Sequence, residues 1–224
     1  MYAEWPPYDP RRRPAGLGLM RASGQPDWAA LRAQLIAMAD RDVTVRAALA
    51  ADGSLFRGYH PAMQKIHQAN AERLADILAS HGWPGEPQAG LEGANAAWLI
   101  AQHAIGWPAF QRAALAALRT AVARGDAPAL QAAMLEDRIR TLEGRPQRYG
   151  TQFDWDEEGR MSPVASEDPA GLDDRRRGLS LRPIEAETAE RRRLVAQEGE
   201  RPPADPEARR REMLDWLRAA GWRG

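Results

Sequence analysis

The chain has 224 residues, and its 31 basic residues balance 31 acidic ones, so the formal net charge at pH 7 is zero. A balanced charge gives no global field that would attract nucleic acid or an acidic membrane surface. The absence of cysteine excludes disulfides, thiolate catalysis and cysteine-ligated metal sites. No apolar run approaches the roughly 18 residues of a membrane span. We therefore expect a soluble, cytoplasmic protein.

Residues 1–26 form a Pro/Arg-rich N-terminal extension. The segment contains the run Arg11-Arg12-Arg13 but lacks the apolar stretch of a secretory signal. We expect it to be unprocessed and to lie outside the folded core.

Helical spacing of apolar residues begins after Asp27, a suitable N-cap, and recurs along the chain as far as Gly144. Glycine and proline separate the helical segments, and Pro108 suits a first turn. The predicted helices span residues 28–50, 62–80, 91–105, 108–124 and 127–143. The nearly unbroken apolar stretch 96–105 predicts that the third of them lies in the middle of the fold.

The pattern changes beyond Gly144. Residues 152–155 and 160–163 predict a small β-hairpin, and residues 166–206, rich in charge and proline, are typical of a surface-wrapping or partly mobile segment. A last amphipathic helix is expected over 206–220.

The predicted fold class is mainly α. It is a compact antiparallel array of about five helices with a C-terminal helix and a small hairpin after the fifth helix. Three regions are expected: the extension 1–26, a helical core domain 27–182, and a charged tail 183–224 that carries the terminal helix.

Polar residues fall inside the apolar arcs of four predicted helices. Because a buried polar group without a partner costs roughly 1–3 kcal/mol, these residues are expected to meet one another in a buried or cleft-lining network. Asp42 and Arg46, spaced i,i+4, are expected to pair. The proposed members are Asp42, Arg46, His67, Asn70, Gln102, His103, Asp137 and Arg138.

Each member allows a structural and a functional interpretation. His103 and His67 are either satisfied core histidines, general acids or bases, or metal ligands. Asp137 with Arg138 forms either an internal ion pair or a clamp for an anionic group. A metal site from His60, His67, His103 and Asp137 lacks compact ligand spacing. The sequence also lacks the glycine patterns of phosphate-binding loops.

Three arginine runs, at 175–177, 191–193 and 209–211, are flanked by acidic residues. This pattern favours a solvated, salt-bridged surface over nucleic-acid binding.

Several short motifs together resemble an uncharacterised bacterial family, a domain of unknown function with QHA, DR and YGTQ signatures. They are Gly58-Tyr59-His60-Pro61, Gly82-Trp83-Pro84, Gln102-His103-Ala104, Asp137-Arg138 and Tyr149-Gly150-Thr151-Gln152. The resemblance implies no activity, but it draws attention to the loop after the fifth helix. Gln147, Tyr149, Thr151 and Gln152 offer amide and hydroxyl groups there that could orient a polar substrate.

The leading hypothesis is an enzyme without a bound cofactor that uses general acid–base chemistry on a small-molecule or peptide-like substrate, with hydrolysis or acyl transfer favoured. The catalytic candidates are His103, His67, Asp137 and Arg138, with Asp137 or another carboxylate orienting His103. The substrate-binding candidates are Asn70, Gln102, Gln147, Tyr149, Thr151, Gln152, Asp42 and Arg46.

Two alternatives stay open. One is a non-catalytic helical binding protein whose polar network is structural, and the other is a metal-dependent hydrolase. No nucleic-acid or membrane partner is expected. A homo-oligomer, or a protein partner bound through the C-terminal tail, is left open.

Overall fold

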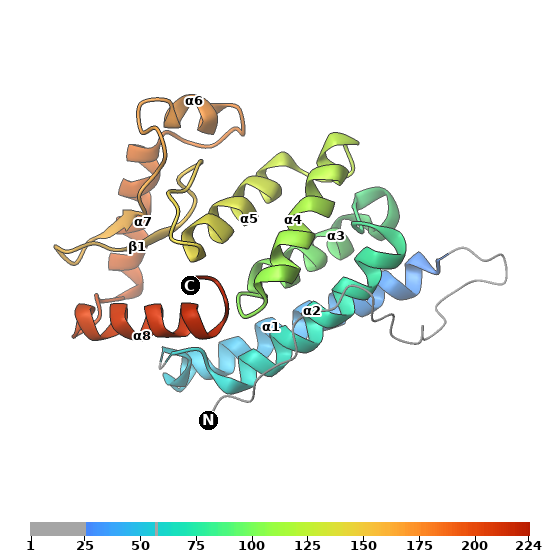
Figure 1. Ribbon diagram of the computed structural model, residues 1–224, viewed down its shortest axis with the longest axis horizontal. Coiled ribbons are helices and arrows are strands. Elements are labelled where there is room, and N and C mark those ends of the chain that lie inside the picture. Colours follow the sequence, from blue (N-terminus) through green and yellow to red (C-terminus); the bar gives the residue numbers. More distant parts are fainter. Residues whose placement is uncertain (1–25, 57) are drawn as a thin grey trace. The chain divides into compact units, whose positions relative to one another are not determined.

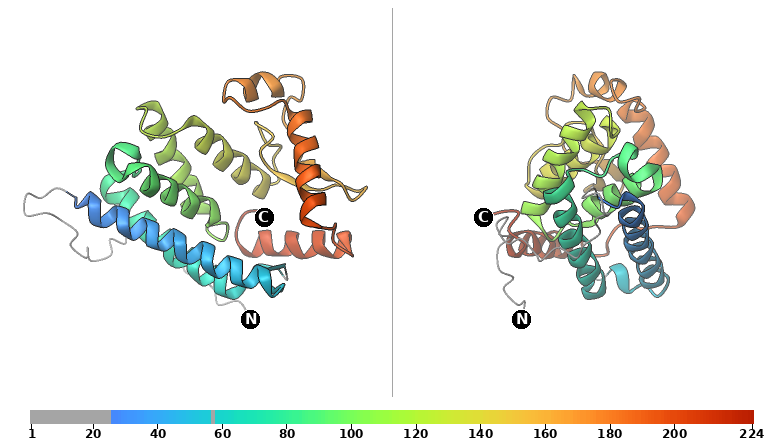
Figure 2. Two further views of the ribbon diagram at one scale, coloured as in Figure 1. Left: turned by 180° about the vertical axis from the view of Figure 1, so that it is seen from behind. Right: turned by 90° about the vertical axis from the view of Figure 1, so that its right-hand side faces the viewer.

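The computed structural model describes residues 26–56 and 58–224, and the chain divides into two compact units. The first unit ends at Ala127, and the second runs from Pro128 to Gly224. Figures 1 and 2 show the ribbon coloured along the chain. Each unit has buried apolar side chains of its own, such as Leu35 in the first and Leu135 in the second.

The described part of the first unit consists of four α-helices and one short 3-10 helix. They are α1 (Trp28–Ala51), η1 (Ser54–Phe56), α2 (Pro61–His81), α3 (Glu86–His103) and α4 (Pro108–Ala123). The side chain of Asp27 caps α1 by accepting a hydrogen bond from the backbone N–H of Ala30. Pro61 and Pro108 occupy first turns, where a missing N–H costs nothing.

Aliphatic side chains from all four helices build the core of the first unit. Full burial of each contributes about 1.5–3 kcal/mol. The largest of them are Leu31, Leu35, Leu74, Ile77, Ile100 and Leu118, each at most 1% exposed.

A glycine lets α3 lie close to α1. A Cβ atom at Gly93 would stand 3.1 Å from Cγ of Arg32, which is tighter than ordinary packing permits. Gly90, with φ 65°, interrupts α3 near its start. The sequence placed the beginning of this helix at residue 91, where the uninterrupted part begins.

The second unit consists of helices and one small sheet. Its elements are α5 (Ala129–Leu142), β1 (Phe153–Trp155), β2 (Met161–Pro163), α6 (Leu172–Arg177), α7 (Ile184–Glu198) and α8 (Pro206–Ala219). The two strands are antiparallel, with Phe153 opposite Pro163. Arg192 of α7 reaches this hairpin and donates to the carbonyl of Met161 at 2.9 Å.

The mainly helical fold and the small hairpin after the fifth helix are confirmed. Residues 166–206 contain two helices, α6 and α7, where the sequence indicated a wrapping or mobile segment. The predicted division at 182 and 183 differs from the boundary between the units and stays a prediction, and residues 1–25 of the extension lie outside the described residues. Among the described helices, none combines the length and apolarity needed to cross a membrane.

Candidate functional site

Asp42 lies in the buried stripe of α1. The buried residues of this helix recur every three or four positions, as Leu31, Leu35, Ala39 and Asp42. Asp42 itself is 0% exposed. The helical pattern therefore places a carboxylate where it otherwise places apolar side chains.

His67 of α2 faces this carboxylate and is itself buried. Its Nε2 lies 3.1 Å from Oδ2 of Asp42, and its Nδ1 lies 2.7 Å from the hydroxyl of Tyr59. The ring of Tyr59 also stacks on the imidazole, with centroids 5.7 Å apart. Tyr59, in the loop before α2, thus fixes the orientation of His67.

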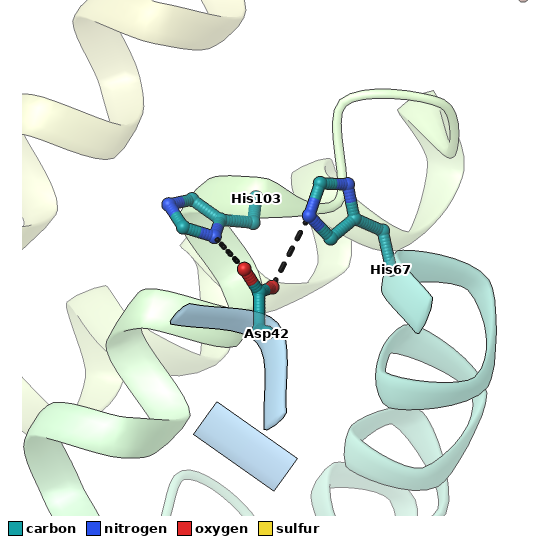
Figure 3. Close-up of side chains that lie close together, drawn as sticks. All are labelled: Asp42, His67 and His103. Carbon is teal, nitrogen blue, oxygen red and sulfur yellow. Dashed lines mark hydrogen bonds and ion pairs between the residues drawn. The ribbon is translucent and has the colours of Figure 1, made fainter. Parts of the chain in front are cut away.

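His103, the last residue of α3, approaches the same carboxylate. Its Nδ1 lies 3.0 Å from Oδ1 of Asp42, and 24% of its side chain is exposed. Figure 3 shows the two imidazole rings on either side of the carboxylate, each directed at one of its oxygens. Three helices therefore bring Asp42, His67 and His103 together, and we call these three residues the Asp–His cluster.

The surroundings of Asp42 favour its charged form. Burial opposes ionisation, but the imidazoles of His103 and then His67 outweigh it and lower the pKa below its ordinary value. Burial, with the charge of Asp42 second, raises the pKa of Tyr59 above the ordinary value. At neutral pH the site consequently holds a carboxylate anion beside a neutral phenol.

One close contact in the cluster is an ion-pair contact outside hydrogen-bond geometry. Oδ2 of Asp42 and Nε2 of His67 approach to 3.1 Å, yet neither atom has a hydrogen-bond partner in the described chain. One ligand-type atom from each of Asp42, His67 and His103 lies within 4.8 Å of the other two. Carboxylate oxygen and imidazole nitrogen are both ligands of zinc, so this set has the composition of a metal site.

Two other candidates in the first unit, Asn70 and His60, make local contacts, and Gln102 is buried. Asn70 is buried and donates to the carbonyl of Met38, which joins α2 to α1. Gln102 is buried next to His103, and its backbone carbonyl accepts from the side chain of Gln111. His60 caps α2 by accepting from the N–H of Ala62 at 3.1 Å.

The predicted pair between Asp42 and Arg46 is wrong. Arg46 is exposed, and the partners of Asp42 among the described residues are the two histidines. The buried stripe of α1 ends at Asp42, so one turn further the helix has left the core. Spacing along one helix could not reveal partners that come from other helices.

Asp137 belongs to the second unit, where it holds the loop after α5. Its carboxylate accepts from the backbone N–H groups of Arg148, Tyr149 and Thr151 and from the hydroxyl of Thr151, at 2.6–3.1 Å. Burial raises its pKa, while these donors oppose the shift. These bonds engage both oxygens of Asp137. The carboxylate that contacts His103 is that of Asp42.

Several side chains in and beside the YGTQ loop also bond to one another. The side chain of Gln147 donates to the carbonyls of Gln152 and Val164 and accepts from the N–H of Gln152. The side chain of Gln152 in turn donates to the hydroxyl of Thr151. These contacts give Gln147, Thr151 and Gln152 a structural role.

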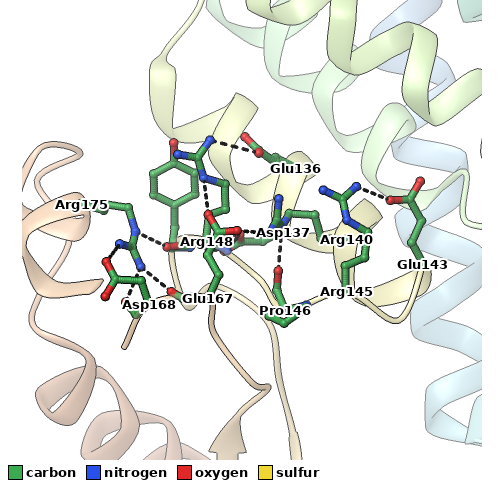
Figure 4. A network of polar contacts seen from close by, with 11 residues as sticks. Glu136, Asp137, Arg140, Glu143, Arg145, Pro146, Arg148, Glu167, Asp168 and Arg175 are labelled. Carbon is green, nitrogen blue, oxygen red and sulfur yellow. Dashed lines mark hydrogen bonds and ion pairs between the residues drawn. The ribbon is translucent and has the colours of Figure 1, made fainter. Parts of the chain in front are cut away.

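Charged residues surround this loop in the second unit, as Figure 4 shows. Arg148 pairs with Glu167 at 2.8 Å, and Arg175 pairs with Asp168 at 2.9 Å. Arg175 also donates to the backbone carbonyl of Arg148. Arg138 lies half-buried on α5 in the same unit.

Sequence reasoning missed two residues that matter for these sites. Tyr59, the partner of His67, lies in a loop where no helical periodicity applies, and only the Gly58 to Pro61 motif drew attention to it. Arg176 is 1% exposed and donates to the carbonyls of Tyr149, Gly150 and Arg182. Its position within an arginine run favoured a solvated interpretation.

The sequence profile of a family of unknown function (DUF6624) matches residues 29–196. The chain therefore belongs to this family, as the resemblance predicted; its bacterial origin and the motifs attributed to the family stay predictions. No curated protein and no solved structure matches the chain.

Proposed function

We propose that the chain is an enzyme that uses general acid–base chemistry on a small polar or peptide-like substrate, with the Asp–His cluster as its reaction centre. One observation carries this proposal. A fully buried carboxylate faces two imidazoles, and one of them, His103, is partly exposed. A proton-transfer group must be both oriented by the protein and reachable by the substrate, and His103 meets both conditions.

His103 acts as the proton acceptor in this proposal. Asp42 is ionised and can only accept a hydrogen bond, so Nδ1 of His103 carries the hydrogen that it donates to Oδ1. When the ring is neutral, the second nitrogen, Nε2, has a lone pair that can accept a proton. This is the arrangement by which a buried carboxylate orients a catalytic histidine in hydrolases.

Hydrolysis or acyl transfer is the favoured reaction class. A histidine base can activate water or a substrate hydroxyl for attack on a carbonyl carbon. Asp137 and Gln147 are left out of the proposed reaction centre, because the carboxylate of Asp137 and the side-chain amide of Gln147 are engaged within the second unit.

The substitution of His103 by Gln tests the proposal, because glutamine keeps much of the volume and polarity of histidine but cannot transfer the proton. The substrates are a panel of p-nitrophenyl esters and amino-acid p-nitroanilides, assayed with EDTA present. General acid–base catalysis contributes about 100- to 10,000-fold, so turnover should fall at least about 100-fold with little change in melting temperature.

The matched control is His81→Gln, which removes a histidine at the end of α2, where its ring contacts Trp28. Full activity in His103→Gln, or no turnover by the natural protein across the panel, would contradict the proposal. An unfolded His103→Gln variant would support the alternative, in which the cluster only fixes the packing of α1, α2 and α3.

A further inference from the structure

We propose that the Asp–His cluster binds one divalent transition-metal ion of the zinc class through a carboxylate oxygen of Asp42, Nε2 of His67 and Nδ1 of His103. The inference goes beyond the proposed function, because such an ion can bind whether or not the chain is an enzyme. Only the role of the ion in catalysis rests on the proposed function.

The donor set has the composition of a catalytic zinc site. Two imidazoles and one carboxylate leave a fourth position for water or substrate. Asp42 provides one negative charge against the two positive charges of the ion, while neutral imidazoles add none. A site with one open position differs from a closed structural site, which has four protein ligands.

The separations between the three donor atoms suit a single ion. Ligands about 2.1 Å from a tetrahedral ion lie about 3.4 Å from one another. Oδ2 of Asp42 lies 3.1 Å from Nε2 of His67, and Oδ1 of Asp42 lies 3.0 Å from Nδ1 of His103. One carboxylate oxygen and the two ring nitrogens lie within 4.8 Å of one another. Rotation of the side chains would bring one carboxylate oxygen and the two nitrogens to this common spacing.

The contact between Asp42 and His67 carries the argument furthest. Both side chains are more than nine-tenths buried, and Oδ2 and Nε2 lie 3.1 Å apart without forming a hydrogen bond. Each of these buried atoms contacts the other without an aligned hydrogen bond, and a buried polar group without a hydrogen bond is costly. An ion bound between them satisfies both atoms at once.

Tyr59 provides the outer support that a ligating histidine needs. When Nε2 of a histidine binds a metal, its Nδ1–H normally donates to a neighbouring acceptor that fixes the ring. Nδ1 of His67 lies 2.7 Å from the hydroxyl oxygen of Tyr59, which can accept this hydrogen bond. Tyr59 is therefore a positioning residue for His67.

An ion at the cluster would take over the activation of water. Zinc with an open position lowers the pKa of a coordinated water towards 7, which provides a nucleophile for the hydrolysis proposed above. His103 would then ligate through Nδ1. Its other nitrogen, Nε2, would remain available to donate a hydrogen bond to a substrate.

The test is a titration of the full chain, freed of any polyhistidine tag and treated with EDTA, with Zn²⁺ by calorimetry and with Co²⁺ by visible absorption. We expect one ion per chain. Affinity should fall at least about 100-fold in Asp42→Asn, His67→Gln and His103→Gln, and about 10-fold in Tyr59→Phe.

The matched controls are Asp40→Asn, an exposed aspartate on α1, and His81→Gln, and both should bind as the natural chain does. Equal affinity in the natural chain and in Asp42→Asn would overturn the inference. Because a ligand variant could lose its fold, crystals of the natural chain soaked in Zn²⁺ provide a second measurement. An anomalous peak among the three side chains supports the site, and a peak only elsewhere overturns it.

The two proposals fail separately. If His103→Gln abolishes turnover in EDTA and no ion binds, the proposed function stands and the metal inference falls. If one ion binds at the cluster and no substrate of the panel is turned over, either in EDTA or with added Zn²⁺, the metal inference stands and the proposed function falls.

Discussion

Asp42 combines full burial with a negative charge. A carboxylate taken out of water normally protonates, unless donors or positive charge stabilise the anion. Here two imidazoles face it, and the net effect lowers its pKa. At the scale of single residues, the cluster therefore depends on an ionised Asp42.

In the metal-free protein, the free energy of unfolding should depend on pH because Asp42 is ionised in the folded chain. The pKa of Asp42 is lower in the folded chain than the ordinary value of about 3.9 in the unfolded chain. Its contribution to stability is thus present above about pH 4 and is lost as the pH falls towards the folded pKa.

Urea unfolding of the natural chain and of Asp42→Asn between pH 7 and pH 3 measures this effect. We expect Asp42→Asn to cost about 1.5–3 kcal/mol at pH 7, and the difference between the two chains to narrow as the pH falls. Asp40→Asn should show no such narrowing. A constant difference across this range would mean that folding does not shift the pKa of Asp42.

At the scale of elements, the periodic helices were predictable and the charged helix was not. Asp27, Pro61 and Pro108 mark helix starts by their chemistry, and the structure confirms these starts to within one residue. Helix α7 has no buried residue, so its sequence lacks the apolar periodicity that would predict a helix. Ion pairs such as Arg193 with Glu190, three residues apart, accompany this helix instead.

The loop after α5 depends on Asp137 in the same way that a helix depends on its cap. Replacing Asp137 by Ala should leave the N–H groups of Arg148, Tyr149 and Thr151 without their acceptor, which costs about 1–3 kcal/mol for each group that stays buried. Thermal unfolding measures this loss.

The Zn²⁺ affinity of Asp137→Ala tests whether Asp137 affects the Asp–His cluster. Asp137→Ala should keep the Zn²⁺ affinity of the natural chain at temperatures where it is folded, because the three proposed ligands all belong to the first unit. Weaker binding by the folded variant would show that Asp137 acts on the cluster.

At the scale of the whole molecule, the sequence predicted that polar residues meet inside the protein but not which ones meet. His67, Asn70, Gln102 and Asp137 are buried, as their positions on helical wheels indicated. The wheel assigns each side chain to a face of its own helix and says nothing about the face opposite. The sequence predicted one network. In the structure, Asp42 lies between two histidines in the first unit, and Asp137 bonds to a loop in the second.

Whether a buried polar side chain has a hydrogen-bond partner depends on the tertiary structure. The amide of Gln147 is bonded on both its oxygen and its nitrogen. In the cluster, Oδ2 of Asp42 and Nε2 of His67 have no hydrogen-bond partner in the described chain. All three residues were candidates from sequence, and only their three-dimensional surroundings separate a structural side chain from a candidate ligand.

The most direct test of the Asp–His cluster is long-range ¹H–¹⁵N NMR of histidine-labelled, metal-free protein at pH 8. We expect His103 to carry its hydrogen on Nδ1, and this pattern to change in Asp42→Asn but not in Asp40→Asn. Addition of one equivalent of Zn²⁺ should shift Nε2 of His67 and Nδ1 of His103 and leave His60 and His81 unchanged. Freely exchanging tautomers of His103 that ignore both Asp42→Asn and Zn²⁺ would contradict the site.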